Sequence, residues 1–265
     1  MSFSSITGST ESTLHTSAEG LRHGMVDIPT ADGTIPAYYA APANIERPPV
    51  ILVIQEIFGV HEHIKDVCRR FAAQGYMAVA PELYQRQGDA ASYTDMPSLI
   101  KDIVSKVPDE QVLADLDASV QWANGQGADT MRLGVTGFCW GGRQVWMYAA
   151  HNPGCKAGVA WYGKLTAGHG PLQVRNPIDI TADLHAPVLG LYGGQDASIP
   201  QEDIRRMEAG LKQGSVCAQS SRIVVYPESG HAFFADYRPS YRAADAQDAW
   251  DKAVSWFDRH LSDAT

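Results

Sequence analysis

The sequence MRLGVTGFCWGGRQVWMYAAH, residues 131–151, contains the pattern that decides the fold. It begins as an apolar run typical of strands and continues as a helical segment bounded by glycine. Gly137 lies two residues before Cys139, and Gly141 lies two residues after it. Since glycine has no Cβ atom to collide across a tight turn, this spacing predicts a strand that turns sharply into a helix, with the cysteine at the tip.

A cysteine in that position has the features of a nucleophile. The N-terminus of the following helix favours negative charge and therefore the thiolate form of Cys139. The backbone N–H of Trp140 is a candidate donor to an oxyanion at the same place. The alternative is that Cys139 is a small buried apolar residue and that the glycines only permit close packing. We interpret Cys139 as the nucleophile because the strand, the helix and the glycines occur together.

The alternation of strand and helix extends along the whole chain. Apolar runs predict strands at residues 23–30, 34–41, 50–55, 76–81, 131–138, 156–162, 187–192 and 222–226. Apolar residues at helical spacing predict helices at residues 60–75, 109–127, 140–151, 200–213 and 243–260. Asp32 and Gly33 predict a hairpin between the first two strands. This order indicates an α/β fold with a mostly parallel central sheet and helices on both faces.

Length and composition are those of one globular domain. The chain has 265 residues, of which 45% are hydrophobic, and we predict a single domain over residues 21–265. Residues 1–20 are rich in serine and threonine and are predicted to be poorly ordered. The net charge of −9 argues against a nucleic-acid-binding or polybasic membrane-binding protein. No segment approaches the ~20 apolar residues of a membrane span, and no secretory signal is evident, so we expect a cytoplasmic protein.

The cysteines form no recognisable framework. Cys68, Cys139, Cys155 and Cys217 are far apart, and none belongs to a CxxC pair. We therefore expect free thiols in a reducing compartment, without a disulfide framework or a structural zinc site. We also expect that the protein uses no metal and no other cofactor.

Two further strand ends carry the groups that a thiol nucleophile needs. The predicted strand at residues 187–192 is followed by Asp196, and the strand at residues 222–226 is followed by His231. The order nucleophile, acid, histidine is that of α/β-hydrolase triads. We expect His231 to act as acid and base and Asp196 to orient its ring. The alternative is that the aspartate only forms a turn and that the histidine is structural.

Glu56 directly follows the buried strand at residues 50–55. An ionised carboxylate in such a place is costly unless it is paired, so we expect a raised pKa or a role in accepting the thiol proton of Cys139. The N–H of Ile57 would then complete the oxyanion hole with that of Trp140. The alternative is a strand-end side chain that reaches solvent.

These segments together resemble the dienelactone hydrolase family. The resemblance spans about residues 25–260 and rests on five ordered motifs, which are QEIFGV at residues 55–60, QGY and APELY within residues 74–84, GFCWGG at residues 137–142, GGQD at residues 193–196 and GH at residues 230–231. It implies an α/β-hydrolase that opens the lactone of a dienelactone to maleylacetate in chloroaromatic breakdown, without a metal. It also implies an acyl-enzyme on Cys139, with His231 and Asp196 completing the triad and Glu56 accepting the thiol proton as substrate arrives.

Two positions depart from the family pattern, and both concern the substrate. The family has a serine directly after the histidine and an arginine four residues after it, where this chain has Ala232 and Ala235. The family's second clamp arginine has no secure counterpart between residues 88 and 106. The cations that remain as candidates for a substrate carboxylate, with surface solvation as the alternative for each, are Arg86, Lys101, Arg143 and Arg238.

Aromatic residues gather at the same strand ends, and we expect a few of them to line an apolar pocket for a flat unsaturated ring. The predicted substrate-binding residues are Phe58, Tyr84, Arg86, Tyr162, Phe233 and Arg238. His61 and His63 flank Glu62 at a polar helix start, which we interpret as a solvated face rather than a metal site.

The sequence therefore predicts a cysteine-dependent hydrolase of a small-molecule lactone or activated ester, of the carboxymethylenebutenolidase type. A broad carboxylesterase or thioesterase with the same triad is the first alternative, and the missing arginines favour it. A non-catalytic binding protein on the same fold is the second. The oligomeric state, the true substrate and its stereochemistry are left open.

Overall fold

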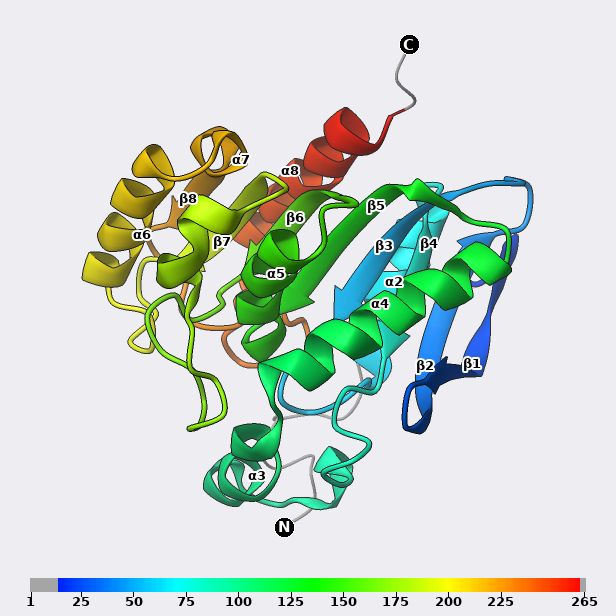
Figure 1. The fold of residues 1–265 in the computed structure, drawn as a ribbon, viewed down its shortest axis with the longest axis horizontal. Helices are drawn as coiled ribbons and strands as arrows, with labels where there is room; N and C mark the ends of the chain where they lie inside the picture. Colours follow the sequence, from blue (N-terminus) through cyan, green and yellow to red (C-terminus); the bar gives the residue numbers. More distant parts are fainter. Residues whose placement is uncertain (1–13, 263–265) are drawn as a thin grey trace.

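A single sheet organises the computed structural model, which describes residues 14–262 (Figure 1). Within these residues, eight strands lie in the order β1-β2-β4-β3-β5-β6-β7-β8. Their bounds are β1 (Leu21–Thr30), β2 (Gly33–Pro42), β3 (Pro49–Ile54), β4 (Met77–Pro81), β5 (Asp129–Phe138), β6 (Cys155–Trp161), β7 (Val188–Gly193) and β8 (Arg222–Tyr226). The pairs from β4 to β8 are parallel, whereas β1 with β2 and β2 with β4 are antiparallel. The predicted α/β fold is confirmed.

Helices cover both faces of this sheet. The longer ones are α2 (Glu62–Ala73), α4 (Asp109–Gly125), α5 (Trp140–His151), α6 (Gln201–Gln213) and α8 (Ala243–Leu261). In Figure 1, α4 and α5 lie on the face toward the viewer, and α2 and α8 lie on the opposite face. The ring of Phe71 in α2 lies 4.6 Å from that of Trp250 and 5.7 Å from that of Phe257, so α2 and α8 pack side by side.

The sequence analysis did not predict the shorter elements. They are α3 (Met96–Asp102), α7 (Val216–Ser220) and the 3₁₀ turns η1 (Ala90–Ser92), η2 (Val104–Lys106) and η3 (Pro177–Asp183). Side-chain caps begin both helices, because Asp95 accepts a hydrogen bond from the N–H of Ser98 at 2.8 Å and Ser215 accepts one from that of Ala218 at 3.1 Å. Such short helices have too few apolar positions to reveal a period.

The parallel register brings the carboxyl ends of six strands to one end of the sheet. Ile54 at the end of β3 pairs with Gly137 of β5, and Phe138 pairs with Trp161 of β6. The segments that follow β3, β5, β6, β7 and β8 therefore converge, and this is where ligand sites form in open α/β sheets.

The N-terminal segment that the sequence predicts to be poorly ordered, residues 1–20, falls partly outside the described residues. Within the described part, the N–H of Thr16 donates to Asp66 in α2 at 2.6 Å, and the Arg69 side chain donates to the Thr16 carbonyl at 3.2 Å. Across residues 14–262, no helix has the length and apolar character needed to cross a membrane.

Candidate active site

Cys139 lies at the turn between β5 and α5. Its backbone has φ 55° and ψ −113°, a conformation that is strained for a residue with a Cβ. The neighbouring glycines are required by close approach, since a Cβ on Gly137 would lie 2.5 Å from the carbonyl oxygen of Gly141. A Cβ on Gly141 would lie 2.4 Å from the carbonyl oxygen of Gln55. The packing of three backbone segments therefore fixes the cysteine at the start of α5.

The side chains of His231 and Asp196 continue from this thiol in a hydrogen-bonded row. Nε2 of His231 lies 3.1 Å from Sγ of Cys139, and Nδ1 of His231 lies 2.6 Å from Oδ2 of Asp196. Cys139 follows β5, Asp196 follows β7 and His231 follows β8. Three strand ends thus bring together the three residues that the sequence assigns to the triad.

Asp196 is oriented by a residue that the sequence prediction missed. Its Oδ1 accepts hydrogen bonds from the backbone N–H of Ser198 at 2.8 Å and from the Ser198 hydroxyl at 2.6 Å. Burial raises the pKa of Asp196, but the hydrogen bonds from His231 and Ser198 and the charge of His231 outweigh it and lower the pKa. Asp196 is therefore held as a carboxylate that faces the imidazole.

The electrostatic surroundings favour the charged form of His231. Burial lowers the pKa of the imidazole, but the charge of the Cys139 thiolate and the hydrogen bonds to Asp196 and Cys139 raise it to about 10. An imidazole in direct contact with a thiol can accept its proton. His231 is therefore placed to exchange a proton with Cys139 and is held on its other side by Asp196.

Glu56 lies beyond the end of β3, and its side chain is 1% exposed. Its Oε2 accepts hydrogen bonds from Nε2 of His61, at 3.1 Å, and from the hydroxyl of Tyr237. Its Oε1 is buried and has no hydrogen-bond partner among residues 14–262. Burial raises the pKa of Glu56, but the hydrogen bond and charge of His61, with smaller contributions from His63 and Tyr237, bring it to about 2. The expectation of a raised pKa is wrong, because these partners outweigh burial.

The interpretation of His61 and His63 as a solvated face is also wrong. His63 is 1% exposed, and its Nδ1 lies 2.9 Å from Oδ1 of Asp236. An isolated antiparallel bridge between Glu56 and Gly59 folds the chain back, so that His61 faces Glu56. Spacing in the sequence gave no sign of this reversal, and the contribution of Tyr237 depends on a long-range contact that no local pattern reports.

Aromatic side chains pack around the triad, as the sequence predicts for this end of the sheet. The ring of Tyr84 lies edge-on to Trp140 at 4.9 Å, and that of Tyr162 lies edge-on to His231 at 5.2 Å. Phe233 packs behind Tyr162 at 5.6 Å. The hydroxyls of Tyr84 and Tyr162 are buried and have no hydrogen-bond partner in the described chain. Burial raises the pKa of both phenols, so both remain O–H donors.

Two of the candidate cations are already paired with carboxylates. Arg86 donates to Asp32 at 2.6 Å and to Asp115 at 2.7 Å, which ties it to the β1–β2 turn and to α4. Arg143 is buried and donates to both carboxylate oxygens of Asp109, at 2.7 and 2.8 Å. The structure thus places Arg86 in a surface ion-pair cluster and Arg143 in a structural pair between α4 and α5.

Arg238 remains beside the site. Its guanidinium carbon lies 5.8 Å from the centre of the Phe58 ring. Arg238 forms no ion pair with any other residue in 14–262. The predicted substrate-binding residues Phe58 and Arg238 are thus brought together, whereas Lys101 lies exposed in α3.

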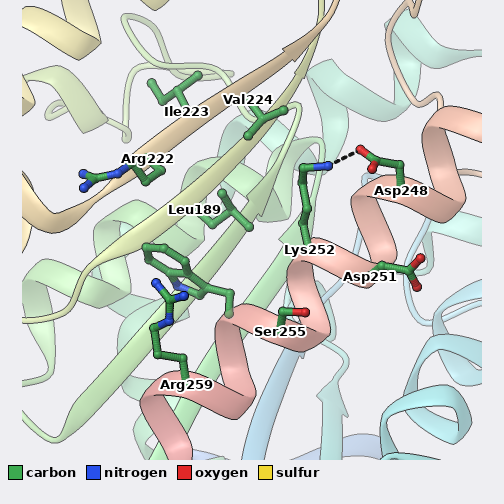
Figure 2. Close-up of a pocket in the computed structure, with 10 residues that line it drawn as sticks. Leu189, Arg222, Ile223, Val224, Asp248, Asp251, Lys252, Ser255 and Arg259 are labelled. Atoms are coloured by element: carbon green, nitrogen blue, oxygen red, sulfur yellow. Dashed lines mark hydrogen bonds and ion pairs between the residues drawn. The ribbon is translucent and has the colours of Figure 1, made fainter.

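A separate groove runs between β8 and α8 at the outer edge of the sheet (Figure 2). Its volume is about 430 Å³. Its lining residues are Leu189, Arg222, Ile223, Val224, Asp248, Asp251, Lys252, Ser255, Trp256 and Arg259. Lys252 forms an ion pair with Asp248, which lies four residues earlier in the same helix, α8. None of the lining residues belongs to the triad, so this groove is distinct from the candidate active site.

No group of three or more His, Cys, Asp or Glu side chains in residues 14–262 is placed to hold a metal ion. The absence of a metal or cofactor from the reaction stays a prediction.

A family model and the most similar sequences point to one family. The model of the dienelactone hydrolase family matches residues 35–261. A protein of Methylorubrum extorquens, provisionally named a carboxymethylenebutenolidase, is 59% identical over 93% of this chain and 84% of its own length. A relative in Escherichia coli with the same provisional name is 54% identical over 89% of this chain and 87% of its own.

A solved structure agrees with this assignment. The crystal structure of a provisionally named dienelactone hydrolase from Klebsiella pneumoniae is 54% identical and superposes with a TM-score of 0.87. The match covers 90% of this chain and 99% of that chain. The chain is therefore a hydrolase that belongs to the dienelactone hydrolase family, as its motifs predict.

Proposed function

We propose that the protein hydrolyses a small-molecule lactone or activated ester through an acyl-enzyme on Cys139. The observation that carries this proposal is the row of contacts from Sγ to the imidazole, at 3.1 Å, and from the imidazole to Asp196, at 2.6 Å. A thiol within proton-transfer distance of an oriented imidazole is the arrangement that nucleophilic catalysis requires.

In the first step, His231 takes the thiol proton and Sγ attacks the substrate carbonyl carbon. The carbon–sulfur bond forms, and the electron pair of the carbonyl moves to its oxygen. The N–H groups of Ile57 and Trp140 are the candidate donors to this oxyanion. The N–H of Trp140 belongs to the first turn of α5, where backbone N–H groups have no partner within the helix.

In the second step, the tetrahedral intermediate collapses to a thioester. The carbon–oxygen bond of the ester or lactone breaks, and the imidazolium of His231 returns its proton to the leaving oxygen. Water then attacks the thioester and gives a proton to His231 as it does so. Release of the carboxylic acid returns Cys139 and His231 to their starting state, with one proton held between Sγ and Nε2, and Asp196 orients the ring throughout.

The role of Glu56 in these steps is a separate proposal. The sequence predicts that Glu56 accepts the thiol proton as substrate arrives. The geometry favours His231 as the acceptor in the free protein, because Nε2 already contacts Sγ while Oε2 of Glu56 is occupied by two donors. Oε1 of Glu56 remains available to accept a hydrogen bond or a proton when substrate binds.

The names of the relatives favour a carboxymethylenebutenolidase activity, that is, a dienelactone substrate. Ala232 and Ala235 replace the serine and arginine that the family resemblance implies, and Arg86 is paired with two carboxylates. Arg238 beside Phe58 is the cation left for a substrate carboxylate. These replacements favour a broad carboxylesterase or thioesterase as the second candidate.

Replacing the nucleophile tests the proposal. Cys139→Ala is expected to lower kcat/KM by about 10³-fold or more without changing the thermal unfolding temperature, because the sulfur supplies the covalent step. Cys217→Ala removes another partly exposed thiol and is the matched control. The measurement is hydrolysis of dienelactone and of short aryl esters by both variants.

The outcomes of that comparison test the nucleophile, the substrate class and the binding-protein alternative. Full activity of the Cys139 variant would overturn the nucleophile. A kcat/KM for aryl esters that equals or exceeds that for dienelactone would favour the broad esterase. A wild-type protein that binds either compound without turnover would support the binding-protein alternative.

A further inference from the structure

A second buried polar cluster adjoins the triad and takes no part in it. It consists of Glu56, His61, His63, Asp236 and Tyr237. Two of its members, His61 and Tyr237, donate to the same oxygen of Glu56. Two donors on one oxygen prevent the carboxylate from rotating without loss of both hydrogen bonds.

The ring of His61 is itself held in place from two sides. It lies edge-on to Tyr237, with ring centres 5.0 Å apart, and stacks on His63 at 6.1 Å with an interplanar angle of 19°. Asp236 fixes His63 through the 2.9 Å contact to Nδ1. His61 is 21% exposed, whereas Glu56 is 1% exposed, so His61 also closes the cluster toward solvent.

We propose that His61 and Tyr237 are positioning residues of the active site, which hold Glu56 by Oε2 and leave Oε1 without a hydrogen-bond partner among residues 14–262. The proposal rests on the proposed function, in which Glu56 serves the reaction at Cys139. A carboxylate fixed in this way presents the same oxygen in every turnover, which is the usual task of residues that support a catalytic group.

The charges around Glu56 agree with this arrangement. The titratable groups that act on it are His61 at the N-cap of α2, His63 in α2, Tyr237 in the segment before α8, and Tyr162 directly after β6. Positive charge on the histidines favours the carboxylate, and the Tyr237 hydroxyl stabilises it by hydrogen bonding. Without these partners, burial alone would favour the protonated acid.

The experiment separates positioning from simple packing. His61→Ala removes the donor and its charge, His61→Gln keeps an amide donor, and Tyr237→Phe removes one hydroxyl. His151→Gln and Tyr76→Phe are matched controls, because His151 contacts Asp117 at 2.7 Å and the Tyr76 hydroxyl donates to Asp258 at 2.5 Å, both outside the cluster.

One readout does not depend on turnover. In a Cys139→Ala background, the titration of Glu56 is followed by the infrared carboxyl band that Glu56→Gln removes. We expect the midpoint to rise by at least one pH unit in His61→Ala, by less in Tyr237→Phe, and not at all in the controls. An unchanged midpoint in both cluster variants would overturn the proposal, even if the protein proves inert toward every ester.

The second readout is the pH dependence of kcat/KM. We expect the acidic limb to move to higher pH in His61→Ala and Tyr237→Phe, and His61→Gln to recover part of the lost rate at neutral pH. A rate loss of equal size in the glutamine and alanine variants, without movement of the limb, would indicate packing alone. Absence of hydrolysis in the wild type would contradict the proposed function and leave the infrared result to decide this inference.

Discussion

Hydrogen-bond donors, more than depth of burial, decide the charge of the acidic residues near the site. Glu56 is buried but has two side-chain donors, and its pKa is lowered to about 2. Glu82, which follows β4, accepts a hydrogen bond from the backbone N–H of Val60, and burial raises its pKa. Both residues follow buried strands, so position along the sequence alone does not distinguish a fixed anion from a group that protonates easily.

The carboxylate of Asp196 gives a prediction at this scale. Asp196→Asn preserves the shape of the side chain but removes the charge that holds the His231 imidazolium and its tautomer. We expect kcat/KM to fall by roughly 10²- to 10⁴-fold, the range seen when a triad loses its acid. The rate of Cys139 alkylation at neutral pH should fall as well, since the imidazole that contacts Sγ is no longer held by a charged partner. Asp117→Asn, which alters the carboxylate beside His151, should leave both rates unchanged.

At the scale of elements, the turn from β5 to α5 tolerates no side chain at its second glycine. In Gly141→Ala, the new Cβ would lie 2.4 and 2.5 Å from two carbonyl oxygens of the β3 end. Backbone atoms cannot move aside as a flexible side chain can, so we expect a loss of about 1–3 kcal/mol or more in the free energy of unfolding. Activity should fall with it, because the same movement displaces Cys139.

Gly125 in α4 provides the control for this prediction, because a Cβ there would meet nothing within 4 Å. Gly125→Ala is expected to leave stability unchanged or to raise it by roughly 0.5–1 kcal/mol. Urea unfolding of both variants measures the difference. Equal stability of the two variants would show that the crowding at Gly141 has no energetic effect.

The elements that the sequence predicts are those with long, uniform patterns. The strand β3 is predicted because burial on both faces leaves a continuous apolar run, and α8 is predicted because burial on one face leaves a helical period. The glycine spacing around Cys139 likewise predicts the turn. The short helix α3 leaves no such pattern, because it depends on its side-chain cap. The hydrogen bond from His61 to Glu56 leaves none either, because it depends on the reversal of the chain at residues 56–59.

At the scale of the whole molecule, the low pKa of Glu56 makes the free energy of unfolding depend on pH in the acidic range. In the unfolded chain Glu56 titrates near 4.5, whereas in the folded protein it stays ionised down to about 2. Its stabilising contribution is complete above pH 4.5 and is lost as the pH falls through that range toward 2. Asp196, whose pKa is also lowered, adds to the same trend below its ordinary range.

We therefore expect the free energy of unfolding to decrease from about pH 4.5 downward, and Glu56→Gln to reduce the slope of this decrease. Urea unfolding at a series of pH values measures it. Glu208→Gln, at an exposed position of α6, should leave the slope as it is. A slope in Glu56→Gln that matches the wild type would contradict a lowered pKa for Glu56.

The contact of Cys139, His231 and Asp196 could be predicted from the sequence because each of them follows a strand of a parallel sheet, so chain order alone predicts that they converge. The partners of Glu56 could not, because Tyr237 lies 181 positions away along the chain and no local pattern links the two residues. Ser198 was missed for a different reason: a serine two residues after an aspartate is a common turn pattern.

Residues 231–242, between β8 and α8, deliver His231 to the sulfur and Tyr237 to Glu56. The side chains of this segment and of residues 55–63 contact each other at Glu56 and His63, so the two segments have to fit each other. A chimaera that takes only one of these two segments from a homologue would combine segments that do not fit each other. Recombination between family members should therefore transfer both segments together.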